Sequence, residues 1–370
     1  MIGLDQAFSG SYAQARKRFL EAAAMAGLPI TSYDHPLTGR DGEVLALDVA
    51  LAGDPRSEAM LVVSSACHGV EGFCGSGVQI ASLHDEEWLA QVRASGVAVL
   101  YLHALNPHGF SHLRRVTQEN VDLNRNFGDY EQPLPINQAY ADVHALLLPA
   151  HWPPDEANRQ SIADYLQRHG MAQFQAAVTQ GQHDFPDGLF FGGTAPTWSN
   201  GTVRQVLRRH AGNTRRLGWI DLHTGLGPSG LGERIFACKD DPVALERARH
   251  WWGGEGTTPI TSFYDGSSSS ARLTGLMWNA AYQECPQAEY TAIAMEYGTV
   301  PIHDVIDALR ADHWLHQHPQ ADADVAGRIK QQILDAFYVD TDAWRGQIVA
   351  QARQAMFQGV AGLVAPRSTA

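Results

Sequence analysis

The sequence has little of what marks a secreted, membrane-spanning or nucleic-acid-binding protein. Its 370 residues include only four cysteines and no Cys-x-x-Cys pair, which argues against a disulfide framework and favours reduced thiols in a cytoplasmic protein. No uninterrupted apolar run approaches the roughly 20 residues of a membrane-spanning helix, and residues 1–10 lack the basic segment of a secretory signal. The formal net charge of −13 argues against general binding to nucleic acid or to an anionic membrane surface. We therefore expect a globular, cytoplasmic protein.

Short apolar segments alternate with helical patterns along the chain. Residues 60–65, 97–105, 217–222 and 291–295 have the composition of buried strands. The helices expected around them cover residues 11–27, 75–93, 157–179, 198–210 and 242–252. This alternation predicts an α/β fold, in which functional sites form beyond the carboxyl ends of the strands.

The segment at about 130–200 is less regular than the rest of the chain. It contains five prolines before its expected helix, and it could be an insertion that covers a site as a lid. We find no internal repeat and no linker that divides the sequence. The expectation is one domain over residues 1–370 that carries this insertion.

Two histidines and one carboxylate follow the expected strands in a pattern suited to a metal. His68 and Glu71 lie just after the strand at 60–65, and their spacing lets both side chains reach one ion from a turn. His223 follows the strand at 217–222. This is the ligand count of a catalytic zinc, which keeps its fourth position for water. We therefore predict one zinc ion per chain, against the alternative of a local hydrogen bond between His68 and Glu71 without metal.

Three further residues lie beside the predicted ligands. Cys67 could be a ligand or a nucleophile, but neighbouring side chains on a strand point to opposite faces, so we interpret it as structural. Asp122 and Asp221 are candidates to accept a hydrogen bond from the second ring nitrogen of a ligand histidine. Ordinary capping or turn roles are the alternative for both aspartates.

A glutamate and a group of arginines complete the candidate site. Glu296 ends the apolar strand at 291–295, where a carboxylate suits a base that takes a proton from zinc-activated water; a salt bridge or helix cap is the alternative. Arg114, Arg115 and Arg125 lie in one polar loop, and a guanidinium suits a carboxylate or a developing oxyanion. One of Arg114 and Arg115 is expected to be a surface residue.

Together these motifs resemble those of the zinc carboxypeptidase (funnelin) family. The resemblance spans residues 61–299, although recognisable identity is confined to the motifs. His68, Glu71 and His223 match the zinc ligands of that family. The resemblance implies an α/β fold with a mixed, mostly parallel central sheet and helices on both faces.

The same resemblance implies roles for the polar residues. Asn124 and Arg125 match the pair that binds the terminal carboxylate of a substrate, and Glu296 matches the general base. Arg115 best matches the arginine that stabilises the oxyanion, with Arg114 as the alternative.

The sequence also departs from the digestive carboxypeptidases. The tyrosine that closes over their substrate has no secure match, because Tyr264 and Tyr282 are only nearby. The string from Asp221 to Thr224 is more similar to the succinylglutamate desuccinylase and aspartoacylase branch, whose members cleave the acyl amide of an N-acyl amino acid. The chain resembles most an uncharacterised bacterial branch near that group.

Three functional hypotheses follow. The first is a zinc-dependent hydrolase that cleaves an amide next to a free carboxylate, with carboxypeptidase-like action on short peptides. The second is an N-acyl amino acid deacylase, and the third is a non-enzymatic binding protein that retains the pocket. A serine hydrolase is excluded because the sequence contains no Gly-x-Ser-x-Gly elbow.

Overall fold

The computed structural model describes residues 2–365. Within this range the strands of one sheet are β1 (Ile30–Thr38), β2 (Val44–Ala52), β3 (Ala59–Ser64), β4 (Ala98–His103), β5 (Arg216–Ser229), β6 (Gly232–Phe236), β7 (Ile260–Thr261) and β8 (Glu289–Gly298). Their order across the sheet is β1-β2-β4-β3-β5-β8-β6-β7. The pairs β3–β4, β3–β5, β5–β8 and β6–β7 are parallel, and the other neighbours are antiparallel. The predicted mixed, mostly parallel sheet is therefore confirmed.

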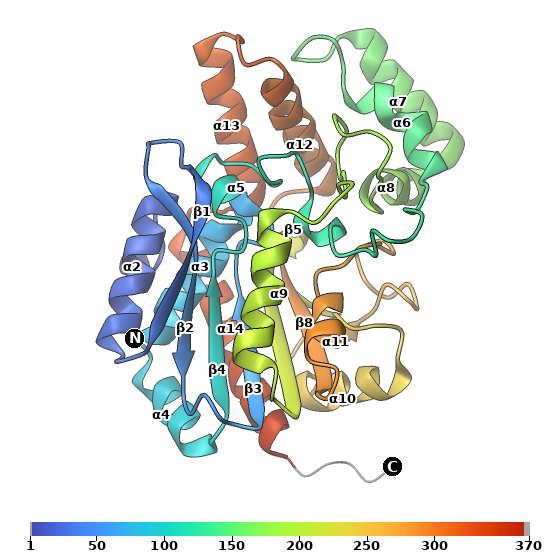
Figure 1. Ribbon diagram of the computed structural model, residues 1–370. Coiled ribbons are helices and arrows are strands. Elements are labelled where there is room, and N and C mark those ends of the chain that lie inside the picture. The colour runs from blue at the N-terminus through green and yellow to red at the C-terminus, as the bar shows by residue number, and fades with distance from the viewer. Residues whose placement is uncertain (1, 366–370) are drawn as a thin grey trace.

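Helices cover both faces of this sheet. They are α1 (Leu4–Ala7), α2 (Tyr12–Met25), α3 (Gly72–Leu83), α4 (Glu86–Ser95), α5 (Pro107–Ser111), α6 (Gln138–Leu147), α7 (Glu156–His169), α8 (Met171–Thr179), α9 (Trp198–Ala211), α10 (Pro242–Trp252), α11 (Asn279–Glu284), α12 (Ile302–Gln317), α13 (Ala323–Phe337) and α14 (Asp342–Val364). Two short 3-10 turns, η1 (Gly69–Glu71) and η2 (Leu123–Arg125), lie in loops. Figure 1 shows α9 in front of the sheet and α14 behind it.

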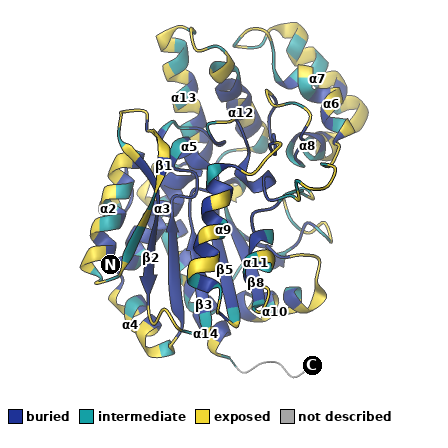
Figure 2. Cartoon of the chain, viewed as in Figure 1, coloured by how far each residue is buried: buried dark blue, intermediate teal, exposed yellow. Residues whose placement is uncertain are grey.

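The central strands lie in the interior of the molecule because their side chains are apolar on both faces of the sheet. Every residue of β4 is buried, and so is every residue of β3 after its first. Figure 2 shows similar burial along β8 and along β5 as far as Gly225, in contrast to the exposed outer sides of the surrounding helices. Apolar runs of this kind are typical of strands covered on both faces. The polar residues that follow them are therefore held at fixed positions.

The structure corrects three expected boundaries. The helix predicted at 75–93 is two helices, because the Asp85 side chain accepts hydrogen bonds from the backbone of Glu87 and Trp88 and starts α4 there. The helix predicted at 157–179 is divided at Gly170 into α7 and α8. The strand predicted at 217–222 is longer than expected, because β5 continues to Ser229.

A second apolar cluster lies apart from the main core. It joins α6 and α8, from the segment at about 130–200, to α12 and α13. Its buried members include Tyr140, Phe174, Leu189, Val305 and Ile333. Figure 1 shows these helices beyond one end of the sheet. The lid role of the segment stays a prediction, but its helices pack on this layer.

Asp312 is a buried anchor of α12, and we expect its loss to destabilise the fold. Its carboxylate accepts hydrogen bonds from Arg114 Nε at 3.1 Å and from Lys330 Nζ at 2.6 Å. The variant Asp312→Asn leaves two cations near each other without their anion, and we expect the free energy of unfolding to fall by about 3 kcal/mol. Urea denaturation at pH 7 measures this loss, and Asp335→Asn on the exposed side of α13 is the matched control.

The effect of Asp312 should also depend on pH. Burial opposes ionisation, but Lys330 and Arg114 together lower the pKa of Asp312 below its usual range. A carboxyl with a lowered folded-state pKa stabilises the protein above its unfolded pKa of about 4, and this stabilisation is lost as the pH falls through the folded pKa. The difference between wild type and Asp312→Asn should therefore shrink below pH 4. An equal difference at pH 7 and pH 3 would contradict this account.

Candidate metal centre

The candidate residues converge at the carboxyl ends of three adjacent strands. In the parallel register, Ser64 at the end of β3 pairs with Asp221 of β5, and His223 pairs with Glu296 of β8. The carboxyl ends of parallel strands meet at one edge of a sheet, so the loops that follow them share a site. The sheet thus brings together motifs that lie more than 200 residues apart in the sequence.

The turn after β3 directs His68 and Glu71 to the same place. His68 precedes η1 and Glu71 ends it, so about one turn of this 3-10 helix separates them and their side chains lie on the same side. The backbone N–H groups of Gly69 and Val70 donate to the carbonyls of Arg115 and Arg114, which fixes the turn against the arginine loop. A Cβ at Gly69 would lie 2.1 Å from the backbone of Gly109, so only glycine permits this approach.

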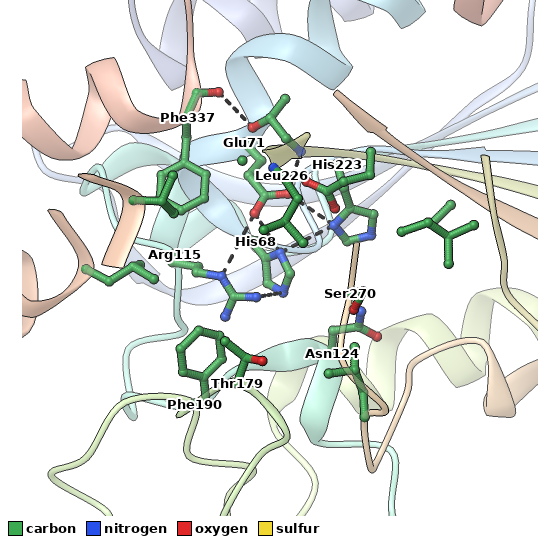
Figure 3. A pocket seen from close by; sticks show the side chains of 18 of the residues that line it. His68, Glu71, Arg115, Asn124, Thr179, Phe190, His223, Leu226, Ser270 and Phe337 are labelled. Carbon is green, nitrogen blue, oxygen red and sulfur yellow. Dashed lines mark hydrogen bonds and ion pairs between the residues drawn. The ribbon is translucent and has the colours of Figure 1, made fainter. Parts of the chain in front are cut away.

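Three potential ligand atoms face one another at the centre of the site. His68 Nδ1 lies 2.7 Å from Glu71 Oε1, and His223 Nδ1 lies 3.1 Å from Glu71 Oε2 and 3.3 Å from His68 Nδ1. All three side chains are buried, and their ligand atoms lie within 4.8 Å of one another. Two imidazole nitrogens and a carboxylate oxygen that converge in this way fit a divalent cation such as zinc. Figure 3 shows the two rings and the carboxylate pointing toward one another.

Each histidine makes a further contact with an aspartate through its other ring nitrogen. His68 Nε2 lies 3.2 Å from Asp122 Oδ1, and His223 Nε2 lies 2.6 Å from Asp221 Oδ2. This is the arrangement that orients histidine ligands and leaves Nδ1 for a metal. Asp221 also accepts hydrogen bonds from the side chains of Ser64 and Trp278. The second ring nitrogen of each candidate ligand is thus held by a buried carboxylate.

The charges of these groups are strongly linked. Burial opposes the ionisation of Glu71, but His68 and His223 together lower the pKa of its carboxyl to about 2. Burial also opposes protonation of His223, yet the adjacent Asp221 raises the pKa of its ring well above the usual range. The backbone N–H of Thr224 donates to Glu71 Oε2 at 3.1 Å. Glu71 is therefore an anion, and its histidine neighbours stabilise the negative charge.

Cys67 lies beside this centre without the properties of a good ligand. Its sulfur is within 4.8 Å of donor atoms of Asp221 and His223. Burial, together with the negative charge of Asp221, raises the pKa of the thiol well above its usual range. Because the thiolate is the form that binds metals and acts as a nucleophile, a protonated Cys67 suits the structural interpretation.

The two neighbouring arginines occupy different environments. Arg115 lines the cavity at the metal centre, forms an ion pair with Asp122 and places its guanidinium 4.7 Å from the centre of the Phe190 ring. Arg114 instead bonds to Asp312 and to Asn120 Oδ1, outside that cavity. Neither is the surface residue that the sequence suggested, since both are buried. The position of Arg115 supports its choice as the oxyanion arginine, a role that stays a prediction.

Two contacts of His68 Nε2 are mutually exclusive as hydrogen bonds. Arg115 Nη2 lies 2.8 Å from this nitrogen, and Asp122 Oδ1 lies 3.2 Å from it. The nitrogen cannot accept a hydrogen bond from the arginine while it donates its own hydrogen to the carboxylate. If Nδ1 holds a cation, Nε2 carries the hydrogen and bonds to Asp122. The contact with Arg115 is then repulsive.

Arg125 and Asn124 present unused donors to the same cavity. Arg125 Nε and Nη2 both donate to the carbonyl of Thr179, and Nη1 donates to the carbonyl of Asn124. Three of its five N–H bonds are thus engaged, and each terminal nitrogen keeps one. Asn124 Oδ1 accepts a hydrogen bond from the backbone of Met277, whereas its Nδ2 has no partner within residues 2–365. These donors suit a carboxylate.

Arg125 carries a buried charge that lacks a partner. Its side chain forms no ion pair with any residue between 2 and 365, although the charge of Asp122 favours its protonation. Burial lowers the pKa of its guanidinium to about 10, so the group remains a cation at neutral pH. A buried cation without a counterion is costly unless an anion binds to it.

Glu296 has the environment expected of a base near the metal ligands. It lines the cavity, is half-buried, and accepts a hydrogen bond from the backbone N–H of Leu226 at 3.1 Å. Burial and the negative charge of Glu71 raise the pKa of its carboxyl to about 8. It forms no salt bridge within the described range 2–365. The alternative of a structural ion pair therefore finds no support in its contacts.

All seven predicted site residues line one cavity of about 90 Å³. They share it with apolar side chains of several elements, namely Phe190, Leu226, Ile235, Phe263, Leu273, Ala294, Ile302, Val305, Ile306, Leu309 and Phe337. No tyrosine from the described residues lines it. Tyr264 and Tyr282 point elsewhere, since the hydroxyl of each bonds to backbone near Cys238 and Lys239.

Several contributors to the site were not anticipated from the sequence. Thr224 and Trp278 bond to Glu71 and Asp221, and Phe190 lies against both Arg115 and Arg125. Thr224 directly follows His223, so its place in the site could have been predicted from the sequence. Trp278 and Phe190 lie in segments whose pattern resembles ordinary packing, and only tertiary contacts reveal them.

The sequence matches one described family. The family is "Protein of unknown function (DUF2817)", and the match covers residues 8–351. The chain belongs to this family. No curated protein matches the sequence. Within residues 2–365 no helix combines the length and hydrophobicity that crossing a membrane requires.

Several solved structures have a fold similar to that of this chain. Thrombin-activatable fibrinolysis inhibitor has 12% identity and a TM-score of 0.53, with 96% of this chain and 74% of that chain covered. The bovine form, in complex with tick carboxypeptidase inhibitor, has 10% identity and a TM-score of 0.55, with 97% and 98% covered. Carboxypeptidase A from Helicoverpa armigera has 12% identity and a TM-score of 0.44, with 88% and 73% covered. The zinc carboxypeptidase-like fold is confirmed, and at these identities the likeness concerns the fold alone.

Proposed function

We propose that this protein is a zinc-dependent hydrolase that cleaves an amide bond adjacent to a free carboxylate, and that short peptides are its substrates. The observation that carries this proposal is the buried cation of Arg125, which has no ion-pair partner among residues 2–365 and lines the same cavity as His68, Glu71 and His223. A metal centre beside an anion site suits a substrate with a carboxylate close to the scissile bond.

Each residue has a defined part in this reaction. His68, Glu71 and His223 would hold a zinc ion, which when bound polarises a carbonyl and lowers the pKa of water. Arg125 and Asn124 donate to the substrate carboxylate and so fix the position of the scissile bond. Glu296 takes a proton from the attacking water and passes it to the leaving amine.

Arg115 and the aspartates support these steps. Arg115 donates to the oxygen on which negative charge develops as the carbonyl is attacked. Asp122 and Asp221 hold the rings of the two histidines through Nε2 and keep Nδ1 directed inward. Different side chains of this protein thus position the metal ligands, bind the substrate carboxylate and transfer the proton.

The deacylase hypothesis uses the same machinery with a different acyl group. An N-acyl amino acid also has a carboxylate next to its amide, so Arg125 would bind it equally. Peptides are favoured here because the cavity is largely apolar, and the cations that line it are Arg115 and Arg125. Both are already assigned to the oxyanion and the terminal carboxylate, so no further arginine or lysine lines the cavity within residues 2–365 for an acidic acyl group.

Replacing Arg125 by glutamine should abolish selection for a free carboxylate. For an N-blocked dipeptide with a free terminus we expect kcat/KM to fall about 10²-fold, because two hydrogen bonds to a charged group are lost. The wild type should discriminate strongly against the same dipeptide as a terminal carboxamide, and the variant should not. Steady-state kinetics on the two compounds, with an N-acyl amino acid as a third, measure this.

The control is Arg272→Gln, which removes an exposed cation that does not line the cavity. It should preserve the preference for the free carboxylate. Equal turnover of acid and carboxamide by the wild type would refute the role of Arg125. Turnover of the N-acyl amino acid alone would favour the deacylase.

A further inference from the structure

The helix α12 presents an apolar face to the cavity. Ile302, Val305, Ile306 and Leu309 are spaced i, i+3, i+4 and i+7, so they lie along one side of the helix. Phe337, at the end of α13, lines the cavity with them. We call these five residues the α12 wall. All five are apolar, and apolar surface of this kind next to a polar reaction centre fits a hydrophobic part of a ligand.

The α12 wall is attached directly to the metal centre. Thr224, whose backbone N–H donates to Glu71, also donates its hydroxyl to the carbonyl of Phe337 at 2.7 Å. At Gly225, where φ is +124°, a Cβ would lie 2.8 Å from the Phe337 ring. Only glycine therefore allows the ring to lie against β5 beside His223. The distance between the wall and the metal ligands is set by these contacts.

The residues of the α12 wall are also packed within the second apolar cluster. Val305, Ile306 and Leu309 belong to the second apolar cluster, where they are packed with Tyr140 and Leu189 from the segment at about 130–200. The ion pairs of Asp312 hold α12 to α13 and to the arginine loop. A face that is packed from behind and anchored at both helices is a preformed surface, and preformed surfaces bind at a lower cost in ordering.

Phe337 of the wall and Asn124 of the carboxylate donors lie on opposite sides of His68. Figure 3 shows His68 between Phe337 on one side and Asn124 on the other. A substrate whose carboxylate is held at Asn124 extends its scissile bond over the metal ligands. The remainder, on the acyl side of that bond, then reaches the α12 wall.

We propose that the α12 wall is a specificity subsite for one aliphatic or aromatic group on the acyl side of the scissile amide. This inference rests on the proposed function and names its substrate class: amides whose acyl half is apolar. The group is either the side chain of the penultimate residue of a peptide or a short acyl chain, because both present the same apolar surface. Charged acyl halves are excluded by desolvation against the wall.

The test compares probes that differ only in the acyl half. The probes are acetyl-leucyl-phenylalanine, acetyl-glycyl-phenylalanine and hexanoyl-phenylalanine, so the leaving residue is constant. We expect the wild-type zinc protein to hydrolyse the leucyl probe with a kcat/KM about 30-fold above that of the glycyl probe, within the range seen for added methylenes in apolar pockets. A hexanoyl probe that exceeds the leucyl probe would support the subsite and identify an acyl chain as its occupant.

Two matched variants separate recognition from stability. Val305→Thr places a hydroxyl on the wall without a large change of shape, and we expect the leucyl-to-glycyl ratio of kcat/KM to fall at least threefold. Val143→Thr makes the same change in the second apolar cluster away from the cavity, and the ratio should stay at the wild-type value. Thermal unfolding of both variants shows whether they are equally folded.

The outcomes distinguish this inference from the proposed function. Equal hydrolysis of the leucyl and glycyl probes would overturn the subsite and leave the hydrolase intact. If no probe is hydrolysed, the proposed function fails, and calorimetric binding of the two peptides to the metal-free protein then decides the subsite. Tighter binding of the leucyl probe, lost in Val305→Thr but kept in Val143→Thr, would support it, and equal binding would overturn it.

Discussion

Replacing Glu296 by glutamine should reduce turnover by about 10²- to 10⁴-fold, the usual contribution of a positioned general base. Glutamine keeps the shape of the side chain and can still accept the hydrogen bond that Leu226 donates, but it has no basic oxygen. Because the candidate ligands are other residues, the variant should bind zinc as the wild type does. Kinetics on an N-blocked dipeptide, together with metal analysis of the same preparation, measure both parts.

The matched control for this experiment lies on the same strand. Glu289→Gln makes the identical change at the start of β8, where the side chain pairs with Arg216 and lies outside the cavity. It should leave turnover within about twofold, as is usual for a substitution at a remote surface position. Unchanged turnover in Glu296→Gln would contradict the assignment of the base. Zinc binding without turnover in the wild type would instead favour the binding-protein hypothesis.

Removal of either histidine should abolish stoichiometric zinc binding. Protein purified without chelator is expected to contain about one zinc per chain, and His68→Ala and His223→Ala should each lose it, together with activity. Each change leaves two of three ligands, which is below the number that catalytic zinc sites use. Elemental analysis of the three proteins after dialysis measures the stoichiometry, and calorimetric titration measures the affinity.

An exposed histidine provides the comparison for these variants. His303→Ala removes an imidazole that lies outside the cavity, so it should retain one zinc per chain. Retention of zinc by His68→Ala or His223→Ala would mean that other residues hold the ion. If the wild type takes up no zinc even when the metal is supplied, the mechanism loses its basis.

The buried strands could be predicted because their signal is local. The apolar runs of β3, β4 and β8 appear in the sequence as continuous segments, and the polar residue that follows each run is visible at once. The edge strand β1 was missed, since most of its residues are partly or fully exposed and present no such run. The helix α6 was missed because it lies in a segment with several prolines, which obscure the helical pattern.

The arginines show what the sequence cannot decide. Arg114 and Arg115 are adjacent and chemically identical, so no local pattern separates them. Arg114 is directed away from the cavity by Asp312, which lies 198 residues further along the chain. A contact of that range depends on how α12 packs, and packing is a property of the whole fold.

By itself, the sequence determined the α/β class and pointed to the three candidate ligands and the candidate base, because each follows a strand whose burial is encoded in its own residues. The tertiary structure alone decided which arginine lines the cavity and that Arg125 keeps two N–H bonds for a ligand. It also decided that one apolar face of α12 lines this cavity. These features depend on distances between segments that are remote in sequence, and such distances are set only when the chain is packed.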